Sequence, residues 1–146
     1  MRRKLHEATG FTLIEVLIVV VILAILAVAV VPQFTDSSDD AKESTALMNL
    51  HTLRSQIQLY RVQHNGLTPS ATLQELTIQT DASGNPGTEF GPYLQFIPEN
   101  PFTGSNTVRE TTENPPTAAS GAADAGWLYH KASGNIWLDD TRYLNR

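Results

Sequence analysis

Residues 10–32 read GFTLIEVLIVVVILAILAVAVVP, and this stretch decides how the N-terminal part of the chain folds. From Val16 to Val31 it contains no polar or charged side chain. The nearly unbroken apolar run Phe11–Val31 holds 21 residues, so as a helix it spans roughly 31 Å, close to the ~30 Å hydrocarbon core of a bilayer. Its many Val and Ile residues favour a strand in water, but in lipid a single span satisfies its backbone only as a helix. The sequence therefore predicts a transmembrane helix.

Charge is distributed unevenly along the 146 residues, whose net charge is −5. Arg2, Arg3 and Lys4 precede the apolar run, whereas the chain from Gln33 onward carries thirteen acids and seven bases. By the positive-inside rule, the basic tip predicts a cytoplasmic N-terminus. The acidic remainder argues against nucleic acid as a partner, because phosphate binding needs clustered Lys and Arg. The chain has no cysteine, which excludes disulfides and thiol chemistry.

Glu15 places a carboxylate a few residues inside the apolar run. At the centre of a membrane span an acid costs on the order of 2.5–3.5 kcal/mol, and less near the edge. If the chain is cut between Gly10 and Phe11, the new amino group of Phe11 is a cation at nearly the same depth. Within one helix the two groups lie about a turn apart, so pairing is awkward. In neighbouring subunits that are offset along the helix axis they can meet, and the alternative is an acid whose side chain reaches water at the membrane edge.

A charge pair between subunits would set their stagger, because apolar side chains alone slide past one another. A head-to-tail contact with a fixed rise and rotation does not close, so it builds a helical filament. Two other interpretations of the run are a plain membrane anchor and a secretory signal, for which residues 27–29, AVA, offer a cleavage site. The run is longer than the apolar part of a usual signal and contains Glu15. These two features favour the filament interpretation.

Residues 10–32 resemble the class III signal of type IV pilins and type II secretion pseudopilins. Gly10 is followed by FTLIEV and by an apolar stretch that ends at Pro32. The resemblance implies that a prepilin peptidase cuts after Gly10 and N-methylates Phe11. It also implies that Glu15, the fifth residue after the cut, is the family's register glutamate. Pro32 matches the family's helix-kink proline.

Later segments resemble the major pseudopilins of type II secretion more weakly, at the end of the long helix, in a middle loop and in the closing strands. These segments are Leu53–Gly66, Gly91–Leu94 with Ile97–Phe102, and Gly126–Tyr129 with Gly134–Trp137. The segment Gly104–Gly126 departs from the resemblance as an unexpected insertion. The acidic, glycine-rich loop that holds calcium in many of these proteins is not clearly present, and only Asp139 and Asp140 stay as weak candidates for a calcium site. The simpler interpretation is that both are solvated charges, as are Asp36, Asp39 and Asp40.

The helix is expected to continue beyond Pro32, because residues 41–64 contain neither Gly nor Pro. One face repeats apolar side chains at spacings of three and four, which predicts packing on a sheet, and its members are Leu50, Leu53, Ile57 and Tyr60. Gly66 is the expected C-terminal stop. Leu59 and Val62 lie off the packing face, and they are modest candidates for contacts between subunits.

The rest of the chain predicts a small head with little regular structure. Thr72 and Glu75 fit a capping box, which suggests a short helix over residues 72–80. Three prolines make residues 91–102 an extended, packed loop, and residues 104–126 are a long surface excursion with a short strand at Val108. Two apolar runs, residues 127–131 and 135–139, flank a turn and predict a β-hairpin. Its aromatic side chains, Trp127, Tyr129 and Trp137, are expected to cover the small core.

These observations predict an α+β fold in which a long N-terminal helix packs on a small antiparallel sheet. Its expected regions are a cleaved leader (1–10), a transmembrane and assembly helix (11–32), an amphipathic continuation (33–66) and a periplasmic head (67–146). The histidines His6, His51, His64 and His130 lie at no metal-ligand spacing, so they are interpreted as surface or structural residues. Neither a catalytic grouping nor a phosphate-binding motif is found, and no enzyme activity is predicted.

The resemblance implies a subunit of the bacterial inner membrane that joins a periplasmic filament, most like the major pseudopilin that drives protein export in type II secretion. The implied partners are other copies of the chain, minor pseudopilins, prepilin peptidase, membrane lipid, and an inner-membrane platform with its ATPase. The alternatives within the family are a type IV pilin or a minor pilin for adhesion, motility or DNA uptake. A different class, a membrane-anchored periplasmic binding module, is the other alternative.

Overall fold

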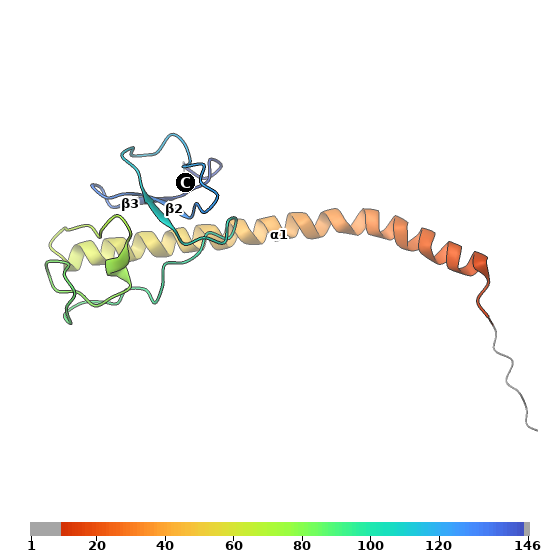
Figure 1. Ribbon diagram of the computed structural model, residues 1–146, viewed down its shortest axis with the longest axis horizontal. Coiled ribbons are helices and arrows are strands. Elements are labelled where there is room, and N and C mark those ends of the chain that lie inside the picture. The colour runs from red at the N-terminus through yellow and green to blue at the C-terminus, as the bar shows by residue number, and fades with distance from the viewer. Residues whose placement is uncertain (1–9, 145–146) are drawn as a thin grey trace, which may run out of the picture. The chain divides into compact units, whose positions relative to one another are not determined.

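The computed structural model describes residues 10–144, except for the side chains of residues 29 and 31–37. Residues 1–9 of the expected leader and the side chain of Pro32, the expected kink, lie outside the described residues. The described part contains a long helix, α1 (Leu13–Gln63), a short 3-10 helix, η1 (Gln74–Leu76), and three strands, β1 (Val108–Glu110), β2 (Trp127–His130) and β3 (Asn135–Leu138) (Figure 1). The expected α+β class with a long N-terminal helix is confirmed.

The chain divides into two compact units, residues 1–40 and residues 41–146. In the first unit, the apolar side chains of α1 from Leu13 to Leu26 are about half exposed or more. Within residues 10–144, none of the helices combines the length and the sustained hydropathy that a membrane span requires. The membrane span therefore stays a prediction.

In the second unit, α1 buries one face along four turns. Leu50, Leu53, Ile57 and Tyr60 are each at most 2% exposed, and Ala46 extends the same stripe by one turn. Their spacing of three and four residues places them on one side of a 3.6-residue helix, where they form a single cluster with the sheet. The expected packing face is confirmed.

The end of α1 is fixed by two residues in left-handed conformations. Asn65 has φ 56° and Gly66 has φ 88°, and the Gly66 N–H donates to the Arg61 carbonyl at 2.8 Å, as in a Schellman cap. Just before them, His64 is fully buried and stacks on the Tyr60 ring at 3.7 Å. Its Nδ1 lies 2.8 Å from the Tyr60 carbonyl and its Nε2 lies 2.9 Å from the Thr80 hydroxyl. His64 is thus a structural residue that ties the helix end to the following loop.

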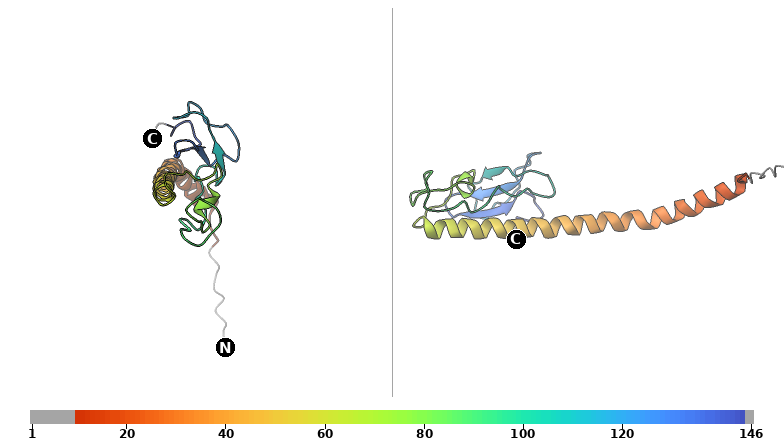
Figure 2. Two further views of the ribbon diagram at one scale, coloured as in Figure 1. Left: turned by 90° about the vertical axis from the view of Figure 1, so that its left-hand side faces the viewer. Right: turned by 90° about the horizontal axis from the view of Figure 1, so that it is seen from below.

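The three strands form one mixed sheet in the order β1-β2-β3. β2 and β3 pair antiparallel as a hairpin, with Trp127 opposite Leu138 and His130 opposite Asn135. The hairpin and the short strand at Val108 are both confirmed. β1 pairs parallel to β2, however, so the expectation of a purely antiparallel sheet is wrong. The sheet lies alongside the C-terminal part of α1 (Figure 2).

The sheet is covered on both faces. Trp127, Tyr129 and Ile136 point toward α1 and belong to the main core, together with Leu138. Leu128 and Trp137 point the other way, because successive strand residues face opposite sides. They are only 4% and 6% exposed and form a second cluster with Leu144. Trp137 therefore covers the outer face of the sheet rather than the helix-facing core.

The expected capping box at Thr72 and Glu75 is wrong. The regular structure there is only the three residues of η1, and its N-cap, Leu73, makes no side-chain cap hydrogen bond. The Glu75 carboxylate instead accepts from the backbone N–H and the hydroxyl of Ser70, at 3.0 and 2.6 Å. Leu73 and Leu76 are fully buried, so burial of two leucines sets this backbone rather than a helix start.

The proline-containing segment 91–102 is irregular and packed, as expected. Tyr93, Leu94, Ile97 and Phe102 lie against the main core. The Tyr93 and Leu94 N–H groups both donate to the Leu76 carbonyl at 2.9 Å. This loop therefore adds partly buried apolar side chains to the main core.

Candidate assembly site

The start of α1 is closed by a reciprocal hydrogen-bonded box between Thr12 and Glu15. The Thr12 backbone N–H and hydroxyl both donate to Glu15 Oε2, at 2.8 and 2.7 Å. In return, the Glu15 N–H donates to the Thr12 hydroxyl at 3.3 Å. This is a capping box, in which an N-cap threonine and a glutamate three residues on satisfy each other's backbone donors.

The box determines where the Glu15 carboxylate lies. A side chain bonded to the Thr12 N–H is turned back toward the N-terminus, so its oxygen lies beside the peptide that links Phe11 to Thr12. The positive end of the helix dipole favours a negative charge at this place. The carboxylate is therefore hydrogen-bonded to the residue that follows Phe11, whose nitrogen would become the amino group after a cut behind Gly10.

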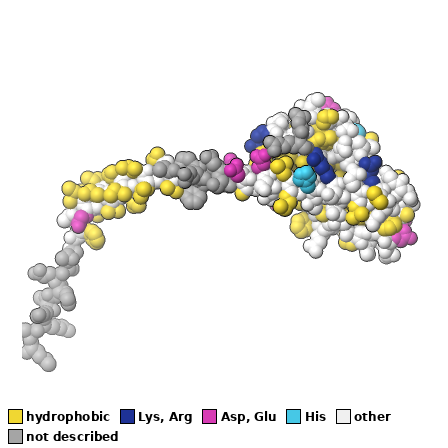
Figure 3. All heavy atoms as spheres, turned by 180° about the vertical axis from the view of Figure 1, so that it is seen from behind, with side chains coloured by type: hydrophobic (Ala, Val, Ile, Leu, Met, Phe, Trp, Pro, Cys, Tyr) yellow, Lys and Arg dark blue, Asp and Glu magenta, His cyan; other side chains and the backbone are white. Residues whose placement is uncertain are grey.

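The surroundings of this box are apolar. Phe11 is 86% exposed, and a shallow groove on the helix surface is lined by Phe11, Glu15, Val16 and Ile18, with Val19 and Val20. Figure 3 shows hydrophobic side chains covering this end of the helix. A carboxylate with hydrogen-bond donors in such a setting suits contact with lipid or another apolar helix, because its donors offset part of the cost of losing water.

The other residues that were predicted to take part in assembly are exposed or lie outside the described side chains. Gly10 is exposed and lies just before the box. Val62 and Leu59 are 80% and 44% exposed on the face of α1 that points away from the core, as expected of residues off the packing face. Asp39 and Asp40 are exposed, whereas the side chains of Pro32 and Asp36 are not described.

The two carboxylates considered for calcium have protein donors on every oxygen. Asp139 accepts the Ser120 N–H on one oxygen, at 2.7 Å, and the Ser120 hydroxyl on the other. Asp140 is held by Arg142, whose Nε and Nη2 lie 3.0 and 2.6 Å from its two oxygens. Calcium needs six to eight oxygens that point lone pairs at the ion, and a neighbouring guanidinium opposes it. Because protein donors already occupy these oxygens and a guanidinium adjoins Asp140, Asp139 and Asp140 as arranged here do not fit a calcium site.

Comparison with known proteins gives the family. Residues 7–31 match the family described as prokaryotic N-terminal methylation motif, and residues 33–122 match the family described as type II secretion system protein G. The chain belongs to the type II secretion system protein G family. This family is that of the major pseudopilin, a structural subunit of the secretion system and not an enzyme. The prediction from sequence is confirmed at this level.

Two relatives of this chain have descriptions that agree with the family. Type II secretion system core protein G of Vibrio cholerae serotype O1 is 33% identical over 103 residues, which cover 68% of this chain and 69% of that protein. Type II secretion system core protein G of Aeromonas hydrophila is 31% identical over 96 residues, which cover 64% of this chain and 67% of that protein. No solved structure matches the chain.

Sequence reasoning found Glu15 but missed its partner. Thr12 has the hydroxyl and the spacing of a capping box, and the pattern T-x-x-E directly before an apolar run was visible. The Ser120–Asp139 and Arg142–Asp140 contacts were also missed. The first joins residues far apart in the sequence and carries no local pattern, whereas the second joins neighbours whose side chains meet only in a folded turn.

Proposed function

We propose that this pseudopilin is made as a precursor, cut after Gly10, methylated on Phe11, and held in the inner membrane by residues 11–32 until it joins a periplasmic filament. The observation that supports this most is the position of Glu15: the acid lies at the start of an otherwise uncharged run, inside the segment that matches the methylation motif. Partners in this process are copies of the chain, minor pseudopilins, prepilin peptidase, and the assembly platform with its ATPase.

The Thr12–Glu15 box explains how the single subunit tolerates its acid in lipid. Two donors of its own backbone and side chain satisfy Glu15 Oε2 before any neighbour is present. An unpaired carboxylate would cost several kcal/mol near the bilayer centre, and less at the edge. The subunit can therefore wait in the membrane with its carboxylate hydrogen-bonded and turned toward the N-terminus.

Assembly then adds a cation from a second subunit. The box turns the Glu15 carboxylate toward the N-terminal end of the helix, where a neighbour shifted along the axis can present its own Phe11 amino group to the same oxygens. In a medium of low dielectric constant this attraction is strong and depends steeply on distance. It therefore favours one stagger among the many that the apolar side chains would allow.

Leaving the bilayer costs the helix little in this scheme. The half-exposed apolar side chains of Leu13–Leu26 exchange lipid for the helices of other subunits, and both surroundings are apolar. The ATPase has to supply the work of extraction, while the charge pair selects the position. The head, which belongs to the other compact unit, stays folded throughout.

The direct test of this function is the mass of the mature N-terminus, measured on protein purified from membranes of cells that carry the prepilin peptidase. We expect a start at Phe11 that carries one methyl group. A chain that still begins at Met1, or one cut near residues 27–29, would contradict the proposal. Deletion of the peptidase gene is the matched control, and it should leave the leader in place.

A further inference from the structure

The segment of residues 111–126, here named the strap, covers the outer face of the sheet. A groove at its edge is lined by strap residues, among them Thr111 and Ala118, and by the strand residue Leu128. Pro116, in the middle of the strap, is buried. Leu128 and Trp137 point away from α1 and would be exposed without a cover, yet they are only 4% and 6% exposed. Part of the unexpected insertion thus lies beside Leu128 on the outer face, and Leu144 completes the cluster of Leu128 and Trp137.

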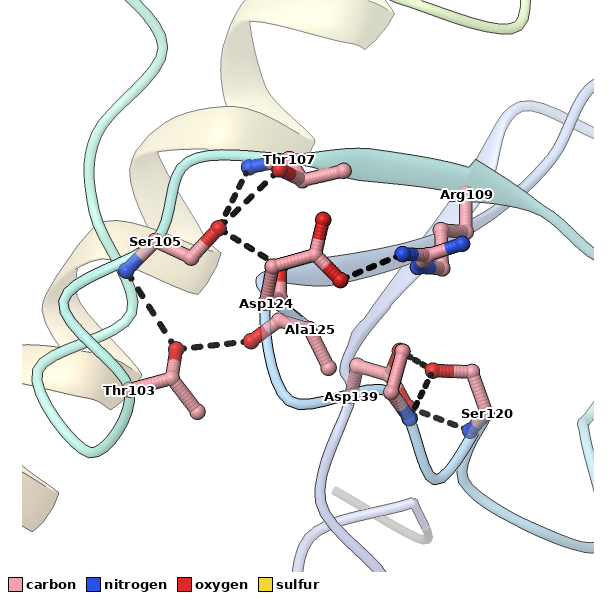
Figure 4. A network of polar contacts seen from close by, with 9 residues as sticks. Thr103, Ser105, Thr107, Arg109, Ser120, Asp124, Ala125 and Asp139 are labelled. Carbon is pink, nitrogen blue, oxygen red and sulfur yellow. Dashed lines mark hydrogen bonds and ion pairs between the residues drawn. The ribbon is translucent and has the colours of Figure 1, made fainter.

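The strap is held at two points by polar contacts, drawn in Figure 4. Near its C-terminal end, the Ser105 hydroxyl donates to the Asp124 carbonyl at 2.6 Å, and Arg109 Nη2 lies 2.5 Å from the Asp124 carboxylate. Nearer the middle, Ser120 donates its N–H and its hydroxyl to the two oxygens of Asp139. The strap therefore connects β1 with the residue that follows β3.

Asp139 is the buried end of this connection. It is 5% exposed, directly follows Leu138 of β3, and donates its own N–H to the Gly126 carbonyl at 3.2 Å. A buried carboxylate has to be matched by donors or by a cation. Here Ser120 provides the donors for both oxygens, so the strap does for Asp139 what a bound ion would otherwise do.

The Asp140 carboxylate forms a salt bridge with Arg142 of the same chain. Arg142 Nη2 lies 2.6 Å from the Asp140 carboxylate, and the guanidinium carbon lies 4.7 Å from the centre of the Phe102 ring. The next residue, Tyr143, stacks on Phe102 at 5.4 Å and donates its hydroxyl to Glu43 of α1 at 3.2 Å. The C-terminal tail is therefore fastened to both the middle loop and the helix.

We propose that the strap and the Arg142 guanidinium close the C-terminal end of this head, so that it folds and stays folded independently of calcium. All four oxygens of Asp139 and Asp140 accept protein hydrogen bonds, and a calcium ion would have to displace them. It would also have to bind beside a guanidinium, which repels it. This inference goes beyond filament assembly, because it concerns the stability of the single subunit.

Thermal unfolding of the full-length chain in detergent tests the inference. The chain has two tryptophans, Trp127 on the inner face of the sheet and Trp137 on the outer face, so their fluorescence reports both layers. Melts are recorded with EGTA, with 1 and 10 mM CaCl2, and with MgCl2 as the ion control. We expect the melting temperatures to agree within about 1 °C.

A bound calcium ion would give a large and easily measured shift. A site with a Kd of about 10 μM, at a hundredfold excess of CaCl2, raises the melting temperature of a domain of this size by roughly 10 °C. The 10 mM sample also reaches the weak sites of extracellular modules, whose Kd is on the order of 0.1–1 mM. A calcium-specific rise of several degrees in either sample would overturn the inference.

Two substitutions, studied with EGTA present, test whether the strap and Arg142 stabilise the head. Ser120→Ala removes the hydroxyl donor to Asp139, and Arg142→Gln removes the cation beside Asp140. We expect Ser120→Ala to lower the melting temperature by roughly 3–8 °C, the shift that corresponds to one lost hydrogen bond to a buried carboxylate. The Arg142 side chain is 60% exposed, so Arg142→Gln should have a smaller effect, roughly 1–4 °C. Lys131→Gln, at an exposed cation of the hairpin turn, is the matched control and should melt like the wild type.

If Ser120→Ala and Arg142→Gln both melt like the wild type, the strap and the guanidinium do not hold the head closed and the inference is wrong. Arg142→Lys keeps the charge but loses the paired hydrogen bonds, so it should fall between the wild type and Arg142→Gln. An intermediate melting temperature for Arg142→Lys would show that the loss in Arg142→Gln comes from the removed contact and not from general misfolding. The melts use unassembled protein, so they are independent of whether a filament forms.

Discussion

At the scale of single residues, the chain contains the same short pattern twice with opposite outcomes. Thr12 and Glu15 form a capping box, whereas Thr72 and Glu75 have the same spacing and do not. The first pair precedes a long helix that has free N–H groups to satisfy. The second pair flanks Leu73 and is followed by Leu76, two buried leucines that hold the backbone in one turn of 3-10 helix, and the Glu75 carboxylate bonds to Ser70 instead. The T-x-x-E pattern therefore forms a capping box only where a helix of several turns follows it.

Thr12→Val tests the box, because valine keeps the shape of threonine and lacks the hydroxyl. The Glu15 carboxylate then loses one of its two donors, and a lost cap is worth about 1 kcal/mol. We expect the sheared filament fraction to fall about fivefold, while the amount of subunit in the membrane is unchanged. Thr12→Ser restores the hydroxyl and should restore the filaments. Equal yields for valine and serine would show that the box has no part in assembly.

Asp140 gives a pH dependence that follows from its partner. Hydrogen bonds from the Arg142 guanidinium hold the pKa of the Asp140 carboxyl below its ordinary value of 3.8. The depressed pKa contributes stability that is fully present above pH ~4 and is lost as the pH falls through the lower pKa of the folded state. We expect the difference in melting temperature between the wild type and Arg142→Gln to narrow as the pH is lowered from about 4 to about 2. A difference that stays constant over this range would contradict the pairing.

At the scale of elements, local sequence patterns predicted the elements whose structure depends on residues close together in the chain. The spacing of Leu50, Leu53 and Ile57 gave the buried face of α1, and the two apolar runs around Gly134 gave the hairpin. The parallel pairing of β1 with β2 was not predictable, because it depends on the strap returning along the outer face of the sheet. The contacts that hold the strap join residues up to 19 positions apart, and no periodicity marks them.

Gly126 is a sensitive point of this arrangement. A Cβ atom added there would lie 2.6 Å from the Thr107 carbonyl oxygen and 2.8 Å from the Ser105 carbonyl oxygen, so the backbone before β1 would have to move. We expect Gly126→Ala to lower the free energy of unfolding by about 1–3 kcal/mol, measured by urea titration of tryptophan fluorescence. Ala123→Ser, at an exposed position of the strap, is the control and should change little. If Gly126→Ala is as stable as the control, the backbone before β1 does not lie as close to Gly126 as the structure has it.

At the scale of the whole molecule, the chain is a pseudopilin with a division of labour between two units. The first unit, residues 1–40, contains the chain's match to the N-terminal methylation motif, residues 7–31, and residues 41–146 carry the folded head. The motif was recognisable from sequence because its pattern is local: a glycine, an acid five residues later, and the apolar run around them. The closure of the head was not, because it depends on how Asp139 and Asp140 find donors after folding.

The central claim is that Glu15 sets the position of each subunit in the filament by meeting the amino group of a neighbour. Glu15→Gln keeps the size and the hydrogen-bonding ability of the side chain and removes the charge. Filaments sheared from cells are counted, and their helical symmetry is determined, for the wild type, for Glu15→Gln and for the control Glu110→Gln, which removes an exposed acid of the head. The account predicts that Glu15→Gln accumulates in the membrane as before but yields at least about tenfold less filament, the effect of losing about 1.4 kcal/mol per contact. Filaments of Glu15→Gln in normal yield and with wild-type symmetry would contradict it.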